Sequence, residues 1–418
     1  MTDLKINKKA VIHYSLIYLF IAFHGATIYA LNKGYLQIGI ELICVFLWVK
    51  NGRIRKNSVL ILLCILFVLT LTVSFVAGSG TGLTFFRPVA DEIMITYTVI
   101  LYDKRNFLNR FFKILFIFAV VSLFFFVILI VNPHILLRLL TVRVEDVNNI
   151  NFVHYGSILY SFSQTYGRTD LRNCGIFTEP GIYAIILNSA VYALLFFNNY
   201  LNINRKQRFL YFLILSITIL STLSTIAYVV LGIIVIGYLF KGERNNRFIK
   251  EKRRVVFLCL IFAVALLANF YSQGDDSILS TYVLSKANST QLQTKESSGN
   301  ARVVTIETCL SIIAKYPFGA GGNFVANSLP DYAVAAQFLF YTAAMGLVNA
   351  GLLYLYFLIP AFKNRQSLLA FIIFIVMYIM LSLAQSKVWY PSLLMFPIMW
   401  QSFNQNMKVR VAKGNISI

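Results

Sequence analysis

The sequence is poor in charged residues and rich in apolar ones. Of its 418 residues, 13% are charged and 58% are hydrophobic. A soluble domain is about a quarter charged and about half apolar. A water-facing globule of this size cannot cover so much apolar surface, so the excess must face lipid. The composition therefore excludes an ordinary soluble enzyme and indicates an integral membrane protein.

Acidic residues are the scarcer charge, with 16 Asp and Glu against 37 Lys and Arg and a formal net charge of +21. Nucleic-acid-binding proteins also show a basic balance of this kind. The membrane supplies a sufficient reason here, because the cytoplasmic loops of membrane proteins collect Lys and Arg. We therefore expect membrane lipid, and no nucleic acid, as a partner.

Histidine and cysteine are few and scattered, with four His and five Cys. The sequence shows no C-x-x-C pair, no metal-ligand spacing and no Ser-His-Asp arrangement, so we expect no metal and no other cofactor. Cys44, Cys64 and Cys259 fall within expected spans. Cys174 and Cys309 fall in or near expected external loops, where an oxidising compartment would allow a disulfide between them.

Uncharged runs such as 114–131 and 368–385 are long enough to cross a bilayer. A hydrocarbon core about 30 Å thick takes roughly 20 helical residues. The sequence predicts an all-α, polytopic transmembrane helical bundle of about twelve spans. We place them near 11–31, 35–50, 58–77, 84–102, 111–131, 180–200, 209–221, 225–240, 255–270, 334–360, 368–385 and 391–404.

The uncharged stretch 209–240 is interpreted as a hairpin of two short spans. As one helix it would be about 48 Å long at 1.5 Å per residue, which exceeds the bilayer core. A single helix would also separate the basic clusters at 205–208 and 241–254. The hydroxyl-rich sequence 221–225 is a suitable turn, because such residues can bond their own backbone.

The distribution of basic residues predicts the orientation. With the amino terminus inside, 26 of the 37 basic residues lie on cytoplasmic segments, as the positive-inside rule requires. Both termini are then cytoplasmic. The first run, 11–31, is too long for a signal peptide and is interpreted as a retained span. We divide the chain into amino-terminal spans (1–131), a periplasmic loop (132–179), central spans (180–270), a large, partly helical periplasmic loop (271–333), and carboxy-terminal spans with a cytoplasmic tail (334–418).

The first external loop ends in a segment, 168–181, that leads directly into a span. Pro180 suits the first helical turn, which puts Glu179 at the N-cap beside the positive end of the helix dipole. That position gives Glu179 a structural role. A carboxylate fixed at the membrane surface could also accept the proton of an attacking hydroxyl. Arg168 and Arg172 either pair with Asp170 or Glu145 or hold phosphate oxygens in a guanidinium fork.

The second external loop predicts an amphipathic helix that begins near Ser298 or Asn300 and stops before Pro317. Arg302 lies in its first turn, where a cation faces the positive end of the dipole. An anionic ligand would reverse that penalty, although Arg302 could instead be a tolerated surface residue. The predicted apolar face comprises Val303, Ile306, Leu310 and Ile313, and it would lie against either the membrane or the bundle.

Further candidate groups are less specific. Residues 319–322, Gly-Ala-Gly-Gly, form either an anion nest or a plain turn. Ionisable residues also gather in the outer parts of the early spans, and this cluster either joins the spans by ion pairs or lines a substrate cavity. Its members are His24, Glu41, Arg87, Asp91 and Glu92. Lys315, Arg87 and His154 are the remaining candidate substrate-binding residues. A single histidine such as His154 does not make a metal site.

Two of these patterns resemble a known family. Arg172-x-x-Gly175-x-Phe177-x-Glu179-Pro180 before a span resembles Wzy-type O-antigen and capsule repeat-unit polymerases. The Arg302 helix followed by Pro317-x-Gly-x-Gly resembles the large periplasmic loop of the wider O-antigen polymerase and ligase family. The resemblance covers roughly residues 165–360.

The resemblance implies a GT-C-like, metal-independent glycosyltransferase in the bacterial inner membrane. Its substrates would be oligosaccharide repeat units on undecaprenyl diphosphate, and a chain-length regulator and a flippase would be partners. Ligases of this family typically carry a histidine early in the span after the large loop. Residues 332–341 contain none, which favours a polymerase over an O-antigen ligase that transfers glycan to lipid A core. A transporter or flippase is the alternative of another class, although we find no internal repeat.

These expectations combine into one catalytic hypothesis. Arg172 and Arg302, with Arg168, hold the diphosphate and stabilise the charge that develops on it. Glu179 orients or deprotonates the acceptor hydroxyl, with Glu307 as the other candidate base.

Overall fold

The fold is taken from a computed structural model of the chain. It describes residues 8–23, 25–27, 33–50, 58–78, 82–103, 106–140, 142–145, 152–165, 168–240, 298–329, 336–363, 365, 367–384 and 391–400. The predicted span at 255–270 lies outside these residues.

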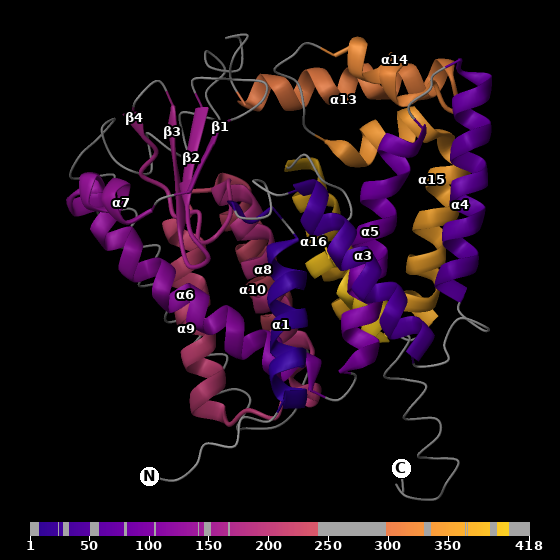
Figure 1. Ribbon diagram of the computed structural model, residues 1–418. Coiled ribbons are helices and arrows are strands. Elements are labelled where there is room, and N and C mark those ends of the chain that lie inside the picture. Colours follow the sequence, from indigo (N-terminus) through magenta and orange to yellow (C-terminus); the bar gives the residue numbers. More distant parts are fainter. Residues whose placement is uncertain are drawn as a thin grey trace, which may run out of the picture.

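Helices make up most of the described chain (Figure 1). They are α1 (Lys8–Ala22), α3 (Lys33–Lys50), α4 (Ser58–Val76), α5 (Gly82–Tyr102), α6 (Phe107–Val131), α7 (Pro133–Leu139), α8 (Pro180–Phe196), α9 (Arg205–Ser221), α10 (Thr225–Phe240), α13 (Ser298–Lys315), α14 (Gly322–Asn327), α15 (Gln337–Lys363) and α16 (Leu368–Ala384).

Several of these helices have the length and composition of membrane spans. Among the described residues, three helices are long and apolar enough to cross a membrane: Val59–Val76, Phe107–Val131 and Phe338–Lys363. Shorter apolar helices cover Ala10–Ala22, Pro180–Phe196, Thr225–Phe240, Leu368–Leu383 and Pro391–Trp400. Large apolar side chains on the outward faces, such as Leu42, Phe75 and Phe124, are exposed. An apolar exterior of this kind suits lipid rather than water. The chain is therefore a helical membrane protein.

Helix α8 is the centre of the bundle. All 17 of its residues are buried, as expected for a helix that is apolar on every side. It packs against α9, α10 and α16. Pro180 at its first position lacks the backbone N–H that would otherwise be unpaired there. The end of the segment 168–179 is therefore anchored to the most deeply buried element of the fold.

The hairpin predicted between residues 209 and 240 is confirmed. Helix α9 ends at Ser221 and α10 begins at Thr225, with Leu223 between them in the left-handed region at φ 49°. The side-chain oxygen of Asn204 caps α9 by accepting from the Gln207 N–H. Two short helices thus replace one overlong span, and their turn lies at the end of the bundle that carries the sheet.

The prediction that the first span reaches residue 31 is wrong, because α1 ends at Ala22. Residues 25–27 leave the helix and make an isolated antiparallel bridge between Ala26 and Phe177. The positive φ of 120° at Gly25 permits the change of direction. The backbone hydrogen bonds lost at the helix end are thereby made to another segment of the chain.

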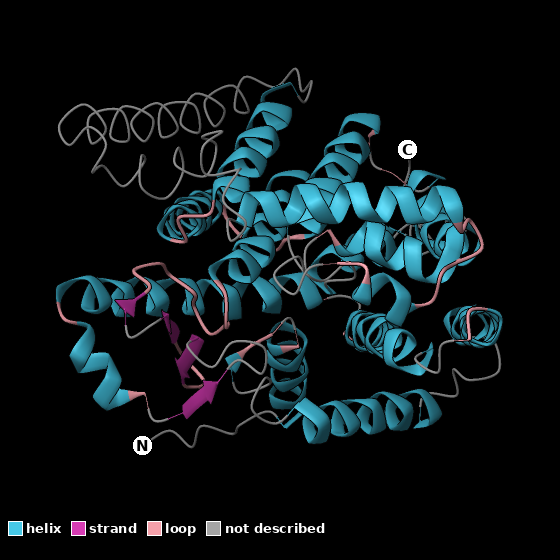
Figure 2. Cartoon of the chain, turned by 90° about the horizontal axis from the view of Figure 1, so that it is seen from above, coloured by secondary structure: helices cyan, strands magenta, loops and turns pink. Residues whose placement is uncertain are grey.

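The all-α expectation is wrong for part of the first external loop. Strands β1 (Val142–Glu145), β2 (Phe152–Gly156), β3 (Ser161–Thr165) and β4 (Arg168–Thr169) form an antiparallel sheet in the order β1-β2-β3-β4. Valine alternates with charged residues in β1, and β2 is rich in valine and aromatic residues, which favours strands. The sheet lies beside the helical bundle (Figure 2) and toward one of its ends (Figure 1), which we call the outer end.

Helix α13 lies across the outer end, with α14 next to it, and α13 packs against α15 (Figure 1). The predicted single span at 334–360 is wrong in one respect, because α15 contains a break at Gly346 with φ 83° and ψ 163°. Backbone groups at the break are paired with the segment that follows α13. The described parts of the two segments predicted to be external therefore lie at the same end of the bundle (Figure 1).

Candidate functional site

The buried side chain of Asn173 fixes the segment before α8 by hydrogen bonds. Its side chain is fully buried, and its amide donates to Ser122 Oγ on α6 at 3.2 Å and to Ser221 Oγ on α9 at 2.9 Å. Its Oδ1 accepts from the Gly175 N–H at 3.0 Å, and its own N–H donates to the Ser221 carbonyl. A satisfied buried polar network of this kind specifies one conformation.

The glycine and the aromatic residue of the motif have steric roles. Gly175 has φ +57°, and a Cβ there would come within 2.6 Å of the Tyr183 ring. Only glycine meets both conditions without strain. Phe177 is buried and its ring centroid lies 5.5 Å from that of Tyr183. These two motif residues shape the loop and do not touch solvent.

Two further elements hold the same loop from the side. The Thr27 N–H donates to the Ile176 carbonyl at 3.0 Å, and the Thr178 N–H donates to the Gly25 carbonyl at 3.2 Å. The Thr27 hydroxyl also donates to Ser161 Oγ on β3 at 2.6 Å. Hydrogen bonds therefore hold the loop that leads to Glu179 against residues 25–27, against the sheet and against the α9–α10 turn.

Glu179 occupies the N-cap position of α8, as predicted, with φ −131° and ψ 141°. Its side chain makes no capping hydrogen bond, and the residue is exposed. The carboxylate therefore keeps the favourable end of the helix dipole without being used as a cap. A fixed backbone with an exposed carboxylate is an arrangement suited to proton transfer or to contact with a cation.

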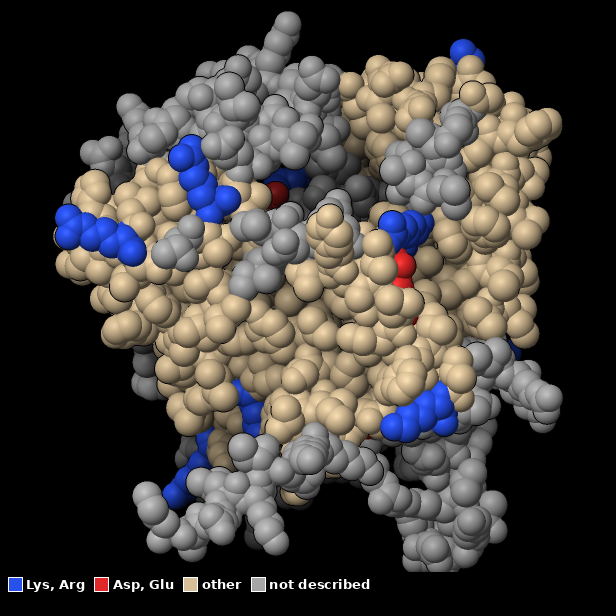
Figure 3. Space-filling view, viewed as in Figure 1, with Lys and Arg blue, Asp and Glu red and all other residues tan. Residues whose placement is uncertain are grey.

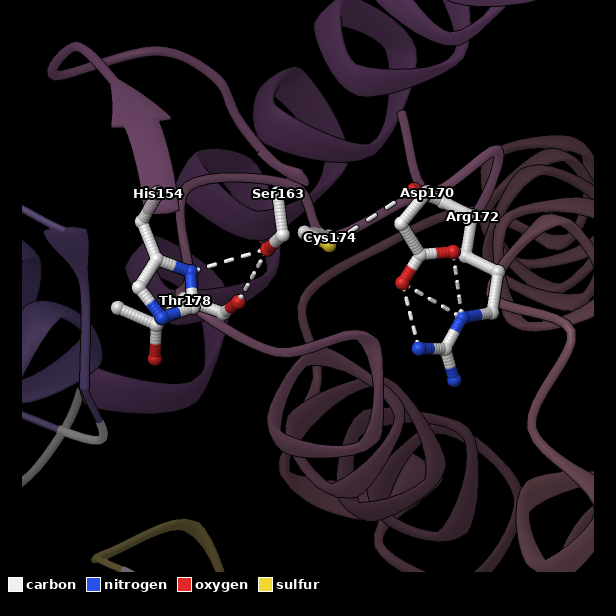
Figure 4. Close-up of polar contacts among 6 residues, drawn as sticks. All are labelled: His154, Ser163, Asp170, Arg172, Cys174 and Thr178. Atoms are coloured by element: carbon white, nitrogen blue, oxygen red, sulfur yellow. Dashed lines mark hydrogen bonds and ion pairs between the residues drawn. The ribbon is translucent and has the colours of Figure 1, made fainter. Parts of the chain in front are cut away.

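Arg172 pairs with Asp170. Its Nε lies 2.7 and 2.9 Å from the two carboxylate oxygens, and its Nη2 lies 2.5 Å from Oδ2 (Figure 4). Burial lowers the pKa of the Arg172 guanidinium, but Asp170, helped by Glu179, raises it more, so the net pKa is raised. The structure thus supports the ion-pair interpretation of Arg172. The Arg168 side chain lies outside what the structure describes.

Arg302 lies in the first turn of α13, as predicted, and is partly buried. Burial lowers the pKa of its guanidinium, and the nearby Glu179 carboxylate opposes that shift. Among the described residues, no carboxylate lies within ion-pair distance of Arg302. The negative charge of Glu179 therefore acts to raise the pKa of both Arg302 and Arg172. The face of the molecule shown in Figure 3 has a hollow with basic and acidic side chains inside it.

The buried face of α13 differs from the predicted one. Thr305, Cys309 and Ile312 are buried, whereas Val303 is 44% and Leu310 51% exposed. Val303 and Leu310 of the predicted apolar face therefore do not pack against the bundle, and their contact with the membrane stays a prediction. The small polar Thr305 and the thiol of Cys309 pack where α13 crosses the bundle, and close approach favours small residues.

Lys315 and Glu307 lie away from Arg302. At 1.5 Å per residue, Lys315 is about 20 Å further along the helix axis, and its ammonium lies over the Tyr316 ring at 5.3 Å. Glu307 is exposed and five positions beyond Arg302, on another side of the helix. Neither residue is brought together with Arg302, so their predicted roles gain no support from the geometry.

The anion-nest interpretation of residues 319–322 is wrong, and the plain-turn interpretation is confirmed. The N–H groups of Gly319, Ala320 and Gly321 donate to the carbonyls of Tyr316, Ala343 and Ala344, respectively. A nest needs N–H groups that point at an anion. These groups instead dock the turn onto the break in α15.

The proposed disulfide is absent, because Cys174 and Cys309 are both free thiols. Both side chains are fully buried. Burial raises the pKa of Cys309 to about 11 and raises that of Cys174 further still. Both thiols act as small apolar packing groups. The described residues also contain no group of three or more His, Cys, Asp or Glu side chains that could hold a metal ion.

Arg87 joins two helices. Its Nε lies 2.8 Å from Glu41 Oε1 on α3 and 4.0 Å from Asp91 Oδ2 on its own helix, and Gln37 donates to Asp91. The cluster therefore matches the interpretation that ion pairs hold early spans together. Its role in a substrate cavity stays a prediction.

His154 is buried on β2, with its Nδ1 2.9 Å from Ser163 Oγ. Burial argues against the predicted direct contact with substrate.

A match to a known family extends over part of the chain. Residues 210–347 match the family model Wzy_C, described as O-antigen ligase. The match covers less than half of the chain; it supports the O-antigen polymerase and ligase family and, with it, a glycosyl-transfer enzyme of the O-antigen pathway. The match includes Arg302 but begins after Arg172 and Glu179. No curated protein and no solved structure matches the chain significantly.

Sequence reasoning missed the residues that hold the loop: Thr27, Asn173 and Ser163. A buried Asn that precedes a Gly by two positions is a known turn signal, and that signal could have identified Asn173. Thr27 and Ser163 carried no local signal, because their partners are distant in the sequence.

Proposed function

We propose that this protein is a metal-independent glycosyltransferase that polymerises oligosaccharide repeat units carried on undecaprenyl diphosphate. The product would be O-antigen or capsular polysaccharide, made at the periplasmic face of the bacterial inner membrane with both termini in the cytoplasm. The observation that carries the proposal is the convergence on Glu179. Its carboxylate favours the charged forms of both Arg172 and Arg302, which come from separate external segments.

The chemistry follows from these three groups. An acceptor hydroxyl attacks the anomeric carbon of the growing glycan, and the bond from that carbon to the diphosphate oxygen breaks. The electron pair leaves with the lipid diphosphate, whose charge Arg302 stabilises, so the arginine takes the part of a metal ion. Glu179 accepts the hydroxyl proton. Arg172, held by Asp170, adds positive field at a fixed position.

The experiment uses a deletion strain complemented with wild-type protein or variants, with glycan ladders as the readout and immunoblots of membranes to check that each variant is present. Arg302→Ala and Glu179→Gln should abolish long chains. Arg302→Lys keeps the charge but loses the planar fork, and should restore them only in part. Lys315→Ala removes a cation from the other end of the same helix and should leave the ladder intact.

A normal ladder from Arg302→Ala, with the protein present in membranes, would overturn the assignment. If Lys315→Ala shortened the glycan ladder as much as Arg302→Ala, positive charge anywhere on α13 would be required. The proposed role of Arg302 beside Glu179 would then lose its support.

The matched family model is described as an O-antigen ligase, and this makes ligation to lipid A core the second candidate. Loss of a polymerase leaves single-unit glycans at the surface, whereas loss of a ligase removes all surface glycan. The absence of histidine from residues 332–341 supports the polymerase.

The break in α15 at Gly346 is a feature that transporters share. In transporters, broken helices present backbone groups to the substrate. Here the Leu347 N–H donates to the Pro317 carbonyl, and the Ala343 and Ala344 carbonyls accept from residues 320 and 321. Proteoliposomes with labelled lipid-linked repeat unit separate the classes, because a carrier moves the lipid without forming polymer.

A further inference from the structure

A buried chain of hydrogen bonds leads from the sheet to the peptide group before Glu179. His154 Nδ1 on β2 lies 2.9 Å from Ser163 Oγ on β3. Ser163 Oγ in turn donates to the Thr178 carbonyl at 3.1 Å (Figure 4). The exposed fractions of His154 and Ser163 are 5% and 1%, so water does not compete for these bonds.

The number of protons that each group carries decides which group donates each hydrogen bond. A serine hydroxyl has one proton, and that proton is used on the Thr178 carbonyl. The hydroxyl oxygen must therefore accept from His154, so Nδ1 of the ring carries a proton. Neutral imidazole in this tautomer and imidazolium both donate at Nδ1. The chain of bonds therefore persists in either protonation state of the ring.

The Thr178 carbonyl belongs to the peptide bond whose nitrogen is that of Glu179. Because a peptide group is planar, holding its oxygen sets the orientation of the Glu179 Cα. The other side of Thr178 is tied to the Gly25 carbonyl through its N–H at 3.2 Å and its hydroxyl at 3.4 Å. This peptide therefore sets where the Glu179 Cα lies and the direction in which its side chain leaves the backbone.

We propose that His154 and Ser163 are positioning residues for the Glu179 carboxylate. The inference rests on the proposed function, in which Glu179 accepts the hydroxyl proton. In place of the direct substrate contact expected for His154, this residue acts on Glu179 through Ser163 and the Thr178 peptide. A carboxylate misplaced by about 1 Å can cost up to about a hundredfold in rate, so the loss of this support affects turnover more than binding.

The test compares two amides at position 154. His154→Asn places an N–H donor where Nδ1 lies, whereas His154→Gln places it where Nε2 lies. Ser163→Ala removes the hydroxyl but keeps the Ser163 carbonyl, which accepts from the Asp170 N–H at 2.9 Å. His134→Ala, at an exposed histidine of the same external segment, is the matched control.

Turnover is measured in proteoliposomes with lipid-linked repeat unit extracted from the deletion strain. Ser163→Ala and His154→Gln should lower kcat by about ten- to a hundredfold and leave KM nearly unchanged. His154→Asn should keep most of the wild-type kcat and the wild-type pH profile. In a Glu179→Gln background, Ser163→Ala should cause little further loss, because the two changes act on the same group.

Several outcomes overturn the inference. They are a full kcat for Ser163→Ala, equal damage from His154→Asn and His154→Gln, or an undiminished effect of Ser163→Ala in the Glu179→Gln background. An altered pH profile for His154→Asn would instead point to acid–base chemistry by the ring. If Glu179→Gln itself keeps full activity, the proposed function of Glu179 fails, and this result is distinguishable from the failure of the positioning role alone.

Discussion

Replacement of Asn173 should destabilise the protein more than its size suggests. Asn173→Ala removes three side-chain hydrogen bonds, to Ser122, Ser221 and the Gly175 N–H. Each is worth about 1 kcal/mol net, which gives about 3 kcal/mol. The Gly175 N–H is also left buried without its acceptor, which adds about 1–2 kcal/mol. The two serine hydroxyls keep their own donations to the Ala119 and Thr218 carbonyls.

Asn188 provides the matched control. It is an asparagine with the same full burial on α8, and its amide makes a single hydrogen bond, to the Ala184 carbonyl of its own helix at 2.9 Å. Asn188→Ala should therefore cost only about 1 kcal/mol. It should leave the loop before α8 in place.

The assay is thermal unfolding of the purified protein in detergent, together with glycan ladders from complemented deletion strains. We expect Asn173→Ala to lower the midpoint by several degrees and to shorten the ladder, whereas Asn188→Ala changes both little. Equal shifts for the two variants would refute the reasoning, because they would show that burial alone, and not the network around the loop, sets the cost.

Three further predictions concern glycines and thiols. Gly346→Ala should sharply reduce the amount of folded protein on membrane immunoblots, because φ there is +83° and a Cβ would meet the Phe318 carbonyl group; Gly351→Ala, with nothing within 4 Å, should not. Gly175→Ala should cost about 2–4 kcal/mol from its positive φ and the aromatic ring beneath it, measured as a lower unfolding midpoint. Cys174 and Cys309 should resist iodoacetamide at pH 8, and mass spectrometry should find no disulfide between them. Because the Cys309 pKa is raised to about 11, its thiolate fraction, and with it alkylation, should grow only as pH approaches that value; fast labelling at pH 8 would contradict the burial.

The sequence by itself determined the membrane-embedded helical class, because uncharged runs such as Ile114–Val131 have no other stable environment than lipid. It also determined the α9–α10 hairpin, since the length of 209–240 and the flanking basic clusters left one solution. Pro180 located the start of α8 and put Glu179 at its N-cap, because proline limits the backbone choices at a helix start. These features depend on local chemistry and on the thickness of the bilayer.

Tertiary structure decided what lies around Glu179. The partners that hold its loop, Thr27, Ser163 and Ser221, come from three separate segments, and no sequence spacing encodes such contacts. It also decided which face of α13 is buried, where Cys309 packs inward and Leu310 faces out, and that Arg172 is paired with Asp170. The physical reason is that an ion pair or a close helix crossing depends on distances in space, whereas a hydrophobic pattern reports only which side chains avoid water.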